Sequence, residues 1–312
     1  MQMTRHSTAL LAAFVCISSW SLSVSAAEAR QGVLVLAHGG NAQWNASVRE
    51  AVAQAELPYA TDVAFGMGMM PQEVAQMQAA VDHLQAQGVG ELLVVPLLVS
   101  SHSEVYRQYE YLLGIRRDSP WPHHTPSPLV LKIPVRLGTP LDSHPYVEDI
   151  VLERARALSQ DPAGEVVVLV AHGPNSVRDN EAWLATMREI AQAVQRQGRF
   201  ARVEACTLRD DASWFTRRRA ARALRHVVAE AGRAHRALVV PLLMARGGIE
   251  QKIPGHLRGL AYRYNGETLV PHPRIALWIR DAVASLSHAV ARRRQHEFRW
   301  QEAVQVVPVS GT

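Results

Sequence analysis

The sequence has little lysine, cysteine and aromatic content, and each scarcity excludes a class of protein. Only Lys132 and Lys252 are lysines, so arginine carries nearly all positive charge, and the formal net charge is only +5. A charge this small and dispersed argues against a nucleic-acid partner. Cys16 and Cys206 are the only cysteines, which excludes a disulfide-rich scaffold. With 312 residues, 48% of them apolar, the chain is too apolar to be disordered and long enough for two domains.

The N-terminal apolar run is short. Residues 9–17 are apolar, follow Arg5 and precede the small residues Ser-Ala-Ala at 25–27. This order is typical of a secretory signal peptide, and the run is too short for a membrane span. We expect residues 1–27 to be a signal peptide, the mature protein to be exported to the periplasm, and no stable membrane span to remain. The alternatives are an uncleaved anchor, or a cytoplasmic protein if the segment is not a functional signal.

The remaining chain contains one pattern twice. Residues 34–39 read Leu-Val-Leu-Ala-His-Gly and residues 168–173 read Val-Leu-Val-Ala-His-Gly. Residues 92–98 and 237–243 likewise share Leu-Val-Val-Pro-Leu-Leu. Matching motifs in the same order indicate a duplication. Short, uninterrupted, β-branched runs are typical of strands buried on both faces of a parallel sheet.

Helical patterns alternate with these strands. Apolar residues recur at helical spacing after His38 and between Pro71 and Gly88, and a further helix is expected from about Pro145 to Leu158. The sequence therefore predicts an α/β protein with two tandem, similar three-layer α/β/α lobes, each with a parallel sheet. The expected divisions are a first lobe over 32–160, a second over 165–290 and a basic tail over 291–312.

Two histidines follow predicted strands of the first lobe. Ligands bind outside the carboxyl ends of parallel strands, where His38 lies in a glycine-flanked turn and His102 follows the strand ending near Val99. Ser101 and Glu104 predict a capping box, which would place His102 in a first helical turn and favour a neutral imidazole. A neutral imidazole binds metal or accepts a proton. The alternative for His102 is a solvent-facing role.

These motifs together resemble a known family. The Ala-His-Gly turn after the first strand, the second strand ending in Phe65, and the Val-Val-Pro-Leu strand followed by a histidine look like the class II tetrapyrrole chelatases. The resemblance is closest to the sirohydrochlorin cobaltochelatase/ferrochelatase group, of CbiX and SirB type. Residues 138–145, Gly-Thr-Pro-Leu-Asp-Ser-His-Pro, resemble that family's closing segment. The resemblance covers residues 32–158 and 165–290.

The resemblance implies a chelatase-like fold and insertion of a divalent metal into sirohydrochlorin or a related tetrapyrrole, with no organic cofactor. It gives His38 and His102 the roles of binding the metal and taking up the pyrrole N–H protons. Insertion releases two protons, so a base of near-neutral pKa must lie near the ring. Imidazole suits Co²⁺, the leading candidate, as well as Fe²⁺ and Ni²⁺. The expected substrate contacts are Met67, Arg107 and His172. Arginines around the cleft, such as Arg107 and Arg136, would orient the many substrate carboxylates, and the alternative for each arginine is a solvated surface role.

The sequence departs from the family pattern at several positions. Gly40 stands where the family usually has serine, and Met67 stands where it often has an acidic residue. The thioether of Met67 would replace a hard ligand, although packing is its simpler role. The second lobe keeps His172, but Arg-Gly-Gly-Ile-Glu at 246–250 occupies the place of the second histidine, with none until His256. We therefore expect a degenerate site in the second lobe.

Three further features of the sequence do not by themselves indicate a function. Cys206 aligns with Phe65 at a strand end and is expected to be a buried thiol. His123 and His124 lie in a proline-rich loop that either collects metal or has no such role. The arginines within 217–225 form a basic helix face that is either solvated or an anion site.

Two other functions compete with catalysis. An exported, non-catalytic tetrapyrrole- or metal-binding protein would keep the fold and lose turnover; Gly40 and Met67 favour it, whereas His38 and His102 favour an enzyme. An α/β-hydrolase is suggested only by His-Gly-Gly after a strand, and the chain has no Gly-x-Ser-x-Gly nucleophile elbow.

Overall fold

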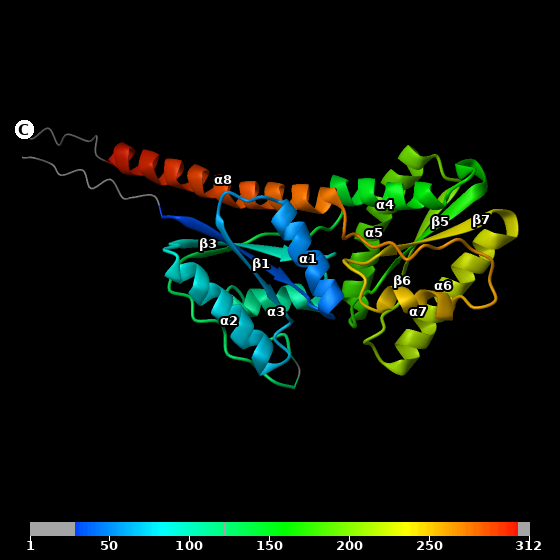
Figure 1. Cartoon of the computed structure of the whole chain (residues 1–312), viewed down its shortest axis with the longest axis horizontal. Helices are drawn as coiled ribbons and strands as arrows, with labels where there is room; N and C mark the ends of the chain where they lie inside the picture. The colour runs from blue at the N-terminus through cyan, green and yellow to red at the C-terminus, as the bar shows by residue number, and fades with distance from the viewer. Residues whose placement is uncertain (1–28, 122, 305–312) are drawn as a thin grey trace, which may run out of the picture.

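The computed structural model describes residues 29–121 and 123–304 (Figure 1). The first repeat comprises β1 (Gln31–Ala37), α1 (Ala42–Gln54), β2 (Ala60–Phe65), α2 (Pro71–Ala86), β3 (Glu91–Leu97), α3 (Glu104–Leu112), β4 (Val135–Leu137) and α4 (Pro145–Leu158). After a short 3-10 turn (Pro162–Gly164), the second comprises β5 (Glu165–Ala171), α5 (Val177–Gly198), β6 (Arg202–Thr207), α6 (Trp214–Ala234), β7 (Arg236–Leu242), α7 (Ile249–His256) and α8 (Pro273–Val304). The expected signal peptide, residues 1–27, lies outside the described residues.

The two sheets repeat one strand order. The first runs β2-β1-β3-β4 and the second β6-β5-β7, and every pairing is parallel. Ala37 pairs with Phe65, and its counterpart Ala171 pairs with Thr207. The fold class and the duplication are thereby confirmed. The alignment of Cys206 with Phe65 is wrong by one residue, because Cys206 pairs with Val170 and points to the other face of its strand. The thiol is nevertheless buried, which raises its pKa to about 12.

Each central strand is buried on both faces. In β1, Val33 and Val35 belong to one buried cluster, whereas Leu34 and Leu36 belong to a second cluster with residues of α2 and α3. All four side chains are inaccessible to solvent. Because side chains alternate along a strand, a strand covered on both sides has no polar positions. This explains the uninterrupted apolar runs.

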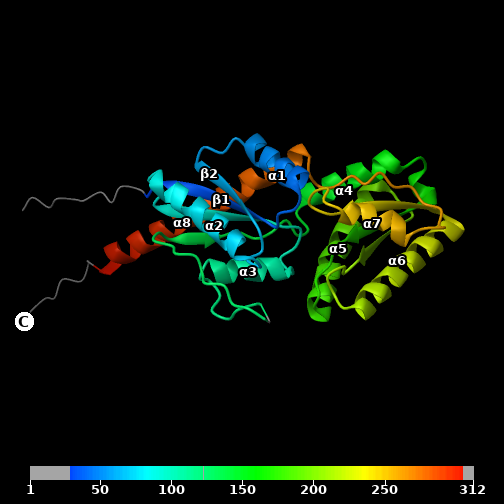
Figure 2. The ribbon, with the colours of Figure 1, turned by 60° about the horizontal axis from the view of Figure 1, so that its bottom comes forward.

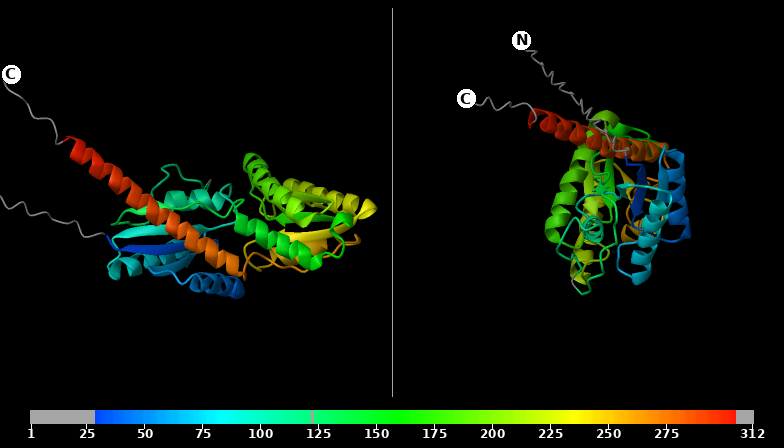
Figure 3. Two further views of the ribbon diagram at one scale, coloured as in Figure 1. Left: turned by 90° about the horizontal axis from the view of Figure 1, so that it is seen from above. Right: turned by 90° about the vertical axis from the view of Figure 1, so that its left-hand side faces the viewer.

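The last helix of each repeat packs against the other lobe. Helix α4 contacts α5 and β7 of the second lobe, whereas α8 contacts α1 and β3 of the first. Figures 1 and 3 show α8 lying along the first lobe and α4 along the second. One buried cluster contains Val35 of β1, Ile150 of α4, Leu169 of β5 and Ile279 of α8. The lobes thus share a continuous core.

Helix α8 passes the expected end of the second lobe. It extends through Val304 and so includes the first part of the segment expected to be a basic tail. Among the described residues, no helix is long and apolar enough to cross a membrane.

Candidate functional site

The turn after β1 presents His38 to solvent. Gly39 has a φ of +83°, which L side chains rarely adopt, and a Cβ atom added there would lie 3.1 Å from Cβ of Phe65 and 3.3 Å from the backbone nitrogen of Gly66. The Nδ1 atom of His38 lies 2.7 Å from the carbonyl oxygen of Gly39. Because a carbonyl oxygen only accepts, Nδ1 carries the hydrogen, and in the neutral ring Nε2 keeps its lone pair. His38 is therefore oriented to bind a metal or accept a proton through Nε2.

Trp44 fixes this turn and joins it to the second lobe. Its ring centroid lies 6.4 Å from that of His38. A Cβ atom added at Gly40 would lie 2.8 Å from Cγ of Trp44, and one added at Gly247 would lie 2.8 Å from its Cδ1. The departure from serine at position 40 follows from this contact, because the indole occupies the space of a side chain. The loops after β1 and β7 therefore meet at one tryptophan.

His102 lies in the loop after β3, one residue before the N-cap of α3. Ser103, not Ser101, is the N-cap, and its hydroxyl accepts from Val105 N at 3.1 Å. The predicted capping box is wrong, because Ser101 is engaged elsewhere. The carboxylate of Asp142 accepts hydrogen bonds from both the amide and the hydroxyl of Ser101. His102 thus precedes the first helical turn, and the dipole argument for its neutral form does not apply. It is half-buried.

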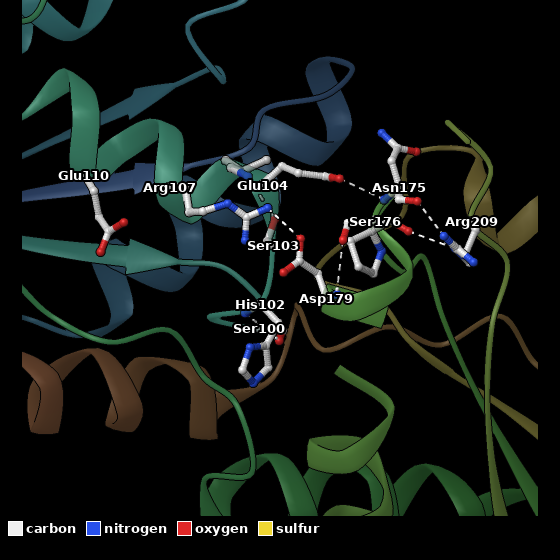
Figure 4. A network of polar contacts seen from close by, with 12 residues as sticks. Ser100, His102, Ser103, Glu104, Arg107, Glu110, Asn175, Ser176, Asp179 and Arg209 are labelled. Carbon is white, nitrogen blue, oxygen red and sulfur yellow. Dashed lines mark hydrogen bonds and ion pairs between the residues drawn. The ribbon is translucent and has the colours of Figure 1, made fainter. Parts of the chain in front are cut away.

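His38 and His102 lie at the same edge of the first sheet. Ala37 pairs with Leu97, so His38 and His102 follow neighbouring parallel strands at their carboxyl ends. In Figure 4 the imidazole of His102 points away from the polar contacts that join α3 to the second lobe. The carboxyl ends of the strands are where parallel sheets bind their ligands.

Two polar contacts hold the lobes together beside His102. The carboxylate of Glu104 accepts from the amide of Asn175 at 2.9 Å, and Arg107 forms an ion pair with Asp179 at 2.7 Å (Figure 4). Both pairs run from α3 to the start of α5. The charge of Arg107 is thus balanced by a residue of this chain.

Arg136 does not lie at the edge that carries His38 and His102. Its guanidinium donates to Glu91 at 2.8 Å. Arg136 lies beside Leu93, near the start of β3, and Glu91 is the first residue of that strand. The ion pair is therefore at the amino end of the sheet, opposite the edge that carries the histidines.

His172 occupies the matching turn of the second lobe but has a carboxylate partner. Its Nδ1 lies 2.9 Å from the carbonyl oxygen of Gly173, and its Nε2 lies 3.3 Å from Asp211. Burial lowers the pKa of His172, but the hydrogen bond to Asp211 and its charge outweigh burial and raise it above its usual value. The hydrogen bond from His172 lowers the pKa of Asp211, and the charge of His38 lowers it further. Asp211 is thus bonded to His172, whereas His38 affects it only through space.

A carboxylate of the same lobe accepts hydrogen bonds from the backbone of the loop after β2. One oxygen of Glu73 accepts from the amides of Met67, Met69 and Met70 at 3.2, 2.8 and 3.3 Å. The side chain of Met67 packs against the cluster under α2 and α3, which agrees with a packing role.

The paired histidines of the proline-rich loop differ in their surroundings. Both are exposed, but His124 also lies 3.3 Å from the carbonyl oxygen of Gly68 and near the ring of Trp121. Within residues 29–121 and 123–304, no three His, Cys, Asp or Glu side chains lie close enough to form a metal site. A transient metal site at His38 and His102 would therefore take its other ligands from solvent or substrate.

The second lobe lacks a histidine in the loop after β7. Arg246 pairs with Glu267 at 2.6 Å, and Glu250 accepts from the amides of Gly247 and Gly248. The carboxylate of Glu250 thus binds the backbone of this loop, and the degenerate site of the second lobe stays a prediction.

Sequence reasoning missed Asp211 and the role of Trp44. Trp44 is recognisable only as one apolar position of a helix. Asp211 follows β6 by four residues, a signal that could have placed it at the same edge as His172.

Comparison with known families decides the classification. The sequence pattern of the CbiX family matches residues 32–158 and 166–286. The chain belongs to the CbiX family. Comparison of the sequence with curated proteins gave no match.

Solved structures of this family share the fold. SirB from Bacillus subtilis with Fe³⁺ is 16% identical, with a TM-score of 0.58 over 82% of this chain and 95% of that one. The sirohydrochlorin chelatase SirB of the subspecies spizizenii with cobalt is 17% identical, with a TM-score of 0.57 over 83% and 96%. CbiX, described as the terminal enzyme of siroheme biosynthesis in denitrifying bacteria, is 17% identical, with a TM-score of 0.51 over 81% and 98%. The CbiX-family fold therefore extends over both lobes.

Proposed function

We propose that this CbiX-family protein inserts a divalent metal ion into sirohydrochlorin or a closely related tetrapyrrole. The observation that carries the proposal is the pair His38 and His102 at one sheet edge, with Nδ1 of His38 bound to the carbonyl oxygen of Gly39 so that Nε2 of the neutral ring keeps its lone pair. The solved SirB structures that share the fold contain iron or cobalt, which supports a metal substrate of this kind.

The chemistry assigns the two histidines complementary tasks. Metal insertion forms bonds from the ion to the ring nitrogens and releases two pyrrole N–H protons. A neutral imidazole can coordinate the incoming ion and afterwards release it, or accept a proton from the ring. We assign metal binding and proton uptake to His38 and His102 jointly. Co²⁺ is the proposed substrate ion, and Fe²⁺ and Ni²⁺ are suited to the same ligands.

Substrate contacts are proposed for three other residues. His172 has the strongest support, because it occupies the matching His-Gly turn of the second lobe and its partner Asp211 is within electrostatic range of His38. Arg107 would bind a substrate carboxylate only by sharing its guanidinium with Asp179. Met67 would contact the macrocycle with the part of its side chain that the core leaves exposed.

An absorption assay tests the proposal. Purified protein is mixed with sirohydrochlorin and Co²⁺, Fe²⁺ or Ni²⁺, and the spectral change of the macrocycle is followed against a protein-free control. A rate above the spontaneous one with at least one ion is expected. No acceleration with any of these ions would refute the proposal that the protein catalyses metal insertion.

A second candidate is an exported tetrapyrrole- or metal-binding protein without turnover. The observation that favours it is the loop after β2, where Met67 replaces a free carboxylate and Glu73 is engaged by three amides. The same assay separates the two, because saturable binding of sirohydrochlorin without acceleration would identify a carrier.

Export is part of the proposal. The segment 1–27 supports transfer to the periplasm with cleavage after residue 27. N-terminal sequencing of the protein recovered from separated cell fractions tests this. An intact N-terminus in the cytoplasmic fraction would contradict it.

A further inference from the structure

The loop between β5 and α5 is held from both lobes. It follows His172 and runs from Gly173 through Asn175. Its backbone is bound by Arg209 of the second lobe and by Glu104 of the first. In Figure 2, α3, which carries Glu104, lies on the side of the first lobe that faces α5. The backbone beside His172 thus has partners in both lobes.

Arg209 binds this loop at three points. Its amide donates to the carbonyl oxygen of His172 at 2.6 Å, and its guanidinium donates to those of Pro174 and Asn175 at 3.0 and 2.5 Å. Its φ is +53°, in the left-handed region that non-glycine residues rarely adopt. Because a strained backbone persists only where its surroundings hold it, this conformation indicates a tightly fixed loop.

The first lobe has a methionine at the corresponding position. Met67 and Arg209 each lie two residues after the end of the matching strands β2 and β6. The amide of Met67 donates to Glu73 at 3.2 Å, whereas that of Arg209 donates to the carbonyl oxygen of His172. The amide at this position therefore fixes the histidine turn in the second lobe and binds a helix side chain in the first.

Glu104 reaches the loop from a position close to His102. It is the first residue of α3 and lies two positions after His102. Its carboxylate accepts from the amide of Asn175 at 2.9 Å, and one turn later Arg107 pairs with Asp179 at 2.7 Å (Figure 4). The chain next to His102 is therefore bonded directly to the second lobe.

These polar contacts are independent of the shared core. The buried residues Val105, Tyr109 and Leu112 of α3 belong to the cluster with α2, whereas α4 and α8 contribute to the cluster that both lobes share. Removing the polar contacts of α3 should therefore leave the shared core intact. A change in the separation of the lobes can then be distinguished from unfolding.

We propose that Glu104 and Arg209 are positioning residues that fix the separation between the sheet edge carrying His102 and the one carrying His172. Through this separation they determine how well a macrocycle fits against both edges at once. A ligand that contacts two edges binds best when they are already correctly spaced. The statement about the macrocycle rests on the proposed function, whereas the fixed separation does not.

Distances between spin labels test the separation directly. The labels are attached at Gln76→Cys in α2 and Ala223→Cys in α6, both exposed positions, and are read by double electron–electron resonance of the full-length protein. Cys16→Ser removes a competing thiol, and Cys206 is buried. With no other substitution, one narrow distance distribution is expected.

Variants of α3 and its partners should change this distribution selectively. Glu104→Ala combined with Asp179→Asn should broaden it, since both contacts from α3 to the second lobe are weakened or lost. Glu104→Gln should keep it narrow, because its carbonyl oxygen still accepts from Asn175. Glu110→Ala is the matched control: Glu110 lies farther along α3 and pairs with Arg116 of the same lobe at 3.1 Å (Figure 4).

Binding of sirohydrochlorin without metal tests the consequence for the ligand. Quenching of tryptophan fluorescence gives the Kd. Arg209→Ala, and Glu104→Ala combined with Asp179→Asn, should each weaken binding by about tenfold, because the preorganised spacing is lost. The rate of metal insertion should fall by up to about 10²-fold, as expected for a misplacement of about 1 Å. Glu104→Gln and Glu110→Ala should leave both quantities unchanged. Thermal unfolding verifies that each variant is folded.

Three results would overturn the proposal. They are a narrow distribution in Glu104→Ala combined with Asp179→Asn, equal broadening by Glu110→Ala, and a wild-type Kd for sirohydrochlorin in that double variant and in Arg209→Ala. A wild-type protein that neither binds nor metallates sirohydrochlorin would instead refute the proposed function. The spin-label distances would then still decide whether Glu104 fixes the separation of the edges.

Discussion

The two lobes share strand order, the His-Gly turn and a glycine with positive φ in that turn, yet they use their polar side chains differently. In the first lobe His38 is exposed and Glu104 reaches across to Asn175. In the second lobe His172 is paired with Asp211 and Glu250 folds back onto its own loop. The duplication kept the scaffold while the loops diverged. The first lobe exposes the imidazole of His38, whereas the second lobe pairs the imidazole of His172 with the carboxylate of Asp211.

The largest expected difference between the lobes is catalytic. His38→Ala should lower the rate constant of metal insertion by about 10²- to 10⁴-fold, because it removes the base and metal ligand. His172→Ala should lower it by about tenfold or less, since its ring is already engaged by Asp211. Stopped-flow absorbance of sirohydrochlorin with Co²⁺ measures both.

His83→Ala is the control, because His83 is an exposed histidine of α2 away from the edge. If His172→Ala were the more damaging substitution, the assignment of roles to the lobes would be reversed.

Because α4 and α8 each pack against the opposite lobe, the stability of each lobe depends on the other. Ile279 of α8 is fully buried, so Ile279→Ala should lower the free energy of unfolding by about 2–5 kcal/mol. Leu277→Ala, at a position that is 39% exposed, should cost less than about 1 kcal/mol. Urea unfolding followed by circular dichroism should show one cooperative transition. Two separate transitions in the wild type would contradict a shared core.

The contact at Trp44 predicts that restoring serine at position 40 is harmful. Gly40→Ser should destabilise the protein by about 1–3 kcal/mol through overpacking, and it should cost less when it is introduced into Trp44→Ala and compared with Trp44→Ala alone. Gly255→Ser is the matched control, because nothing lies within 4 Å of a Cβ added there. Thermal unfolding of these proteins provides the test. Equal stability of Gly40→Ser and wild type would show that the indole of Trp44 moves aside at little cost in free energy.

The smallest effect is a pH dependence of the second lobe. The pKa of His172 is raised, so its contribution to stability is complete below about 6.5, the usual value for histidine, and is lost as the pH rises through the folded-state pKa. The pKa of Asp211 is lowered, so its contribution is complete above about 3.9 and is lost as the pH falls. The pair therefore contributes most between about pH 4 and 6.5.

Because the side chain of Asp211 is 70% exposed, the contribution should be below about 1 kcal/mol. Urea unfolding at pH values from 5 to 9 compares wild type with Asp211→Asn. The difference between them should shrink as the pH rises. A difference that grows with pH would contradict the pairing.

Much of the fold follows from the sequence because its causes are local. The runs at 33–37 and 166–171 are apolar without interruption since both faces of each strand are covered, and this alone predicts a parallel sheet with helices on both sides. The packing of α4 and α8 against the opposite lobes could not be predicted from the sequence. An amphipathic pattern shows that each helix is buried on one face, but not which sheet covers that face.

The candidate site was predictable only in part. His38 and His102 could be placed because parallel strands end at one edge. The N-cap of α3 could not, since the competing residue Asp142 lies 41 positions from Ser101. The pairing of His172 with Asp211 depends on loop geometry that no periodic pattern encodes.

The central claim is that the histidine pair of the first lobe is the metal-insertion centre. The most direct test is the rate of Co²⁺ insertion into sirohydrochlorin by wild type and by the double variant His38→Ala with His102→Ala, both shown to be folded by thermal unfolding. The account predicts a wild-type rate well above the spontaneous one and a double-variant rate equal to it. A double variant that retained the wild-type rate would contradict the claim.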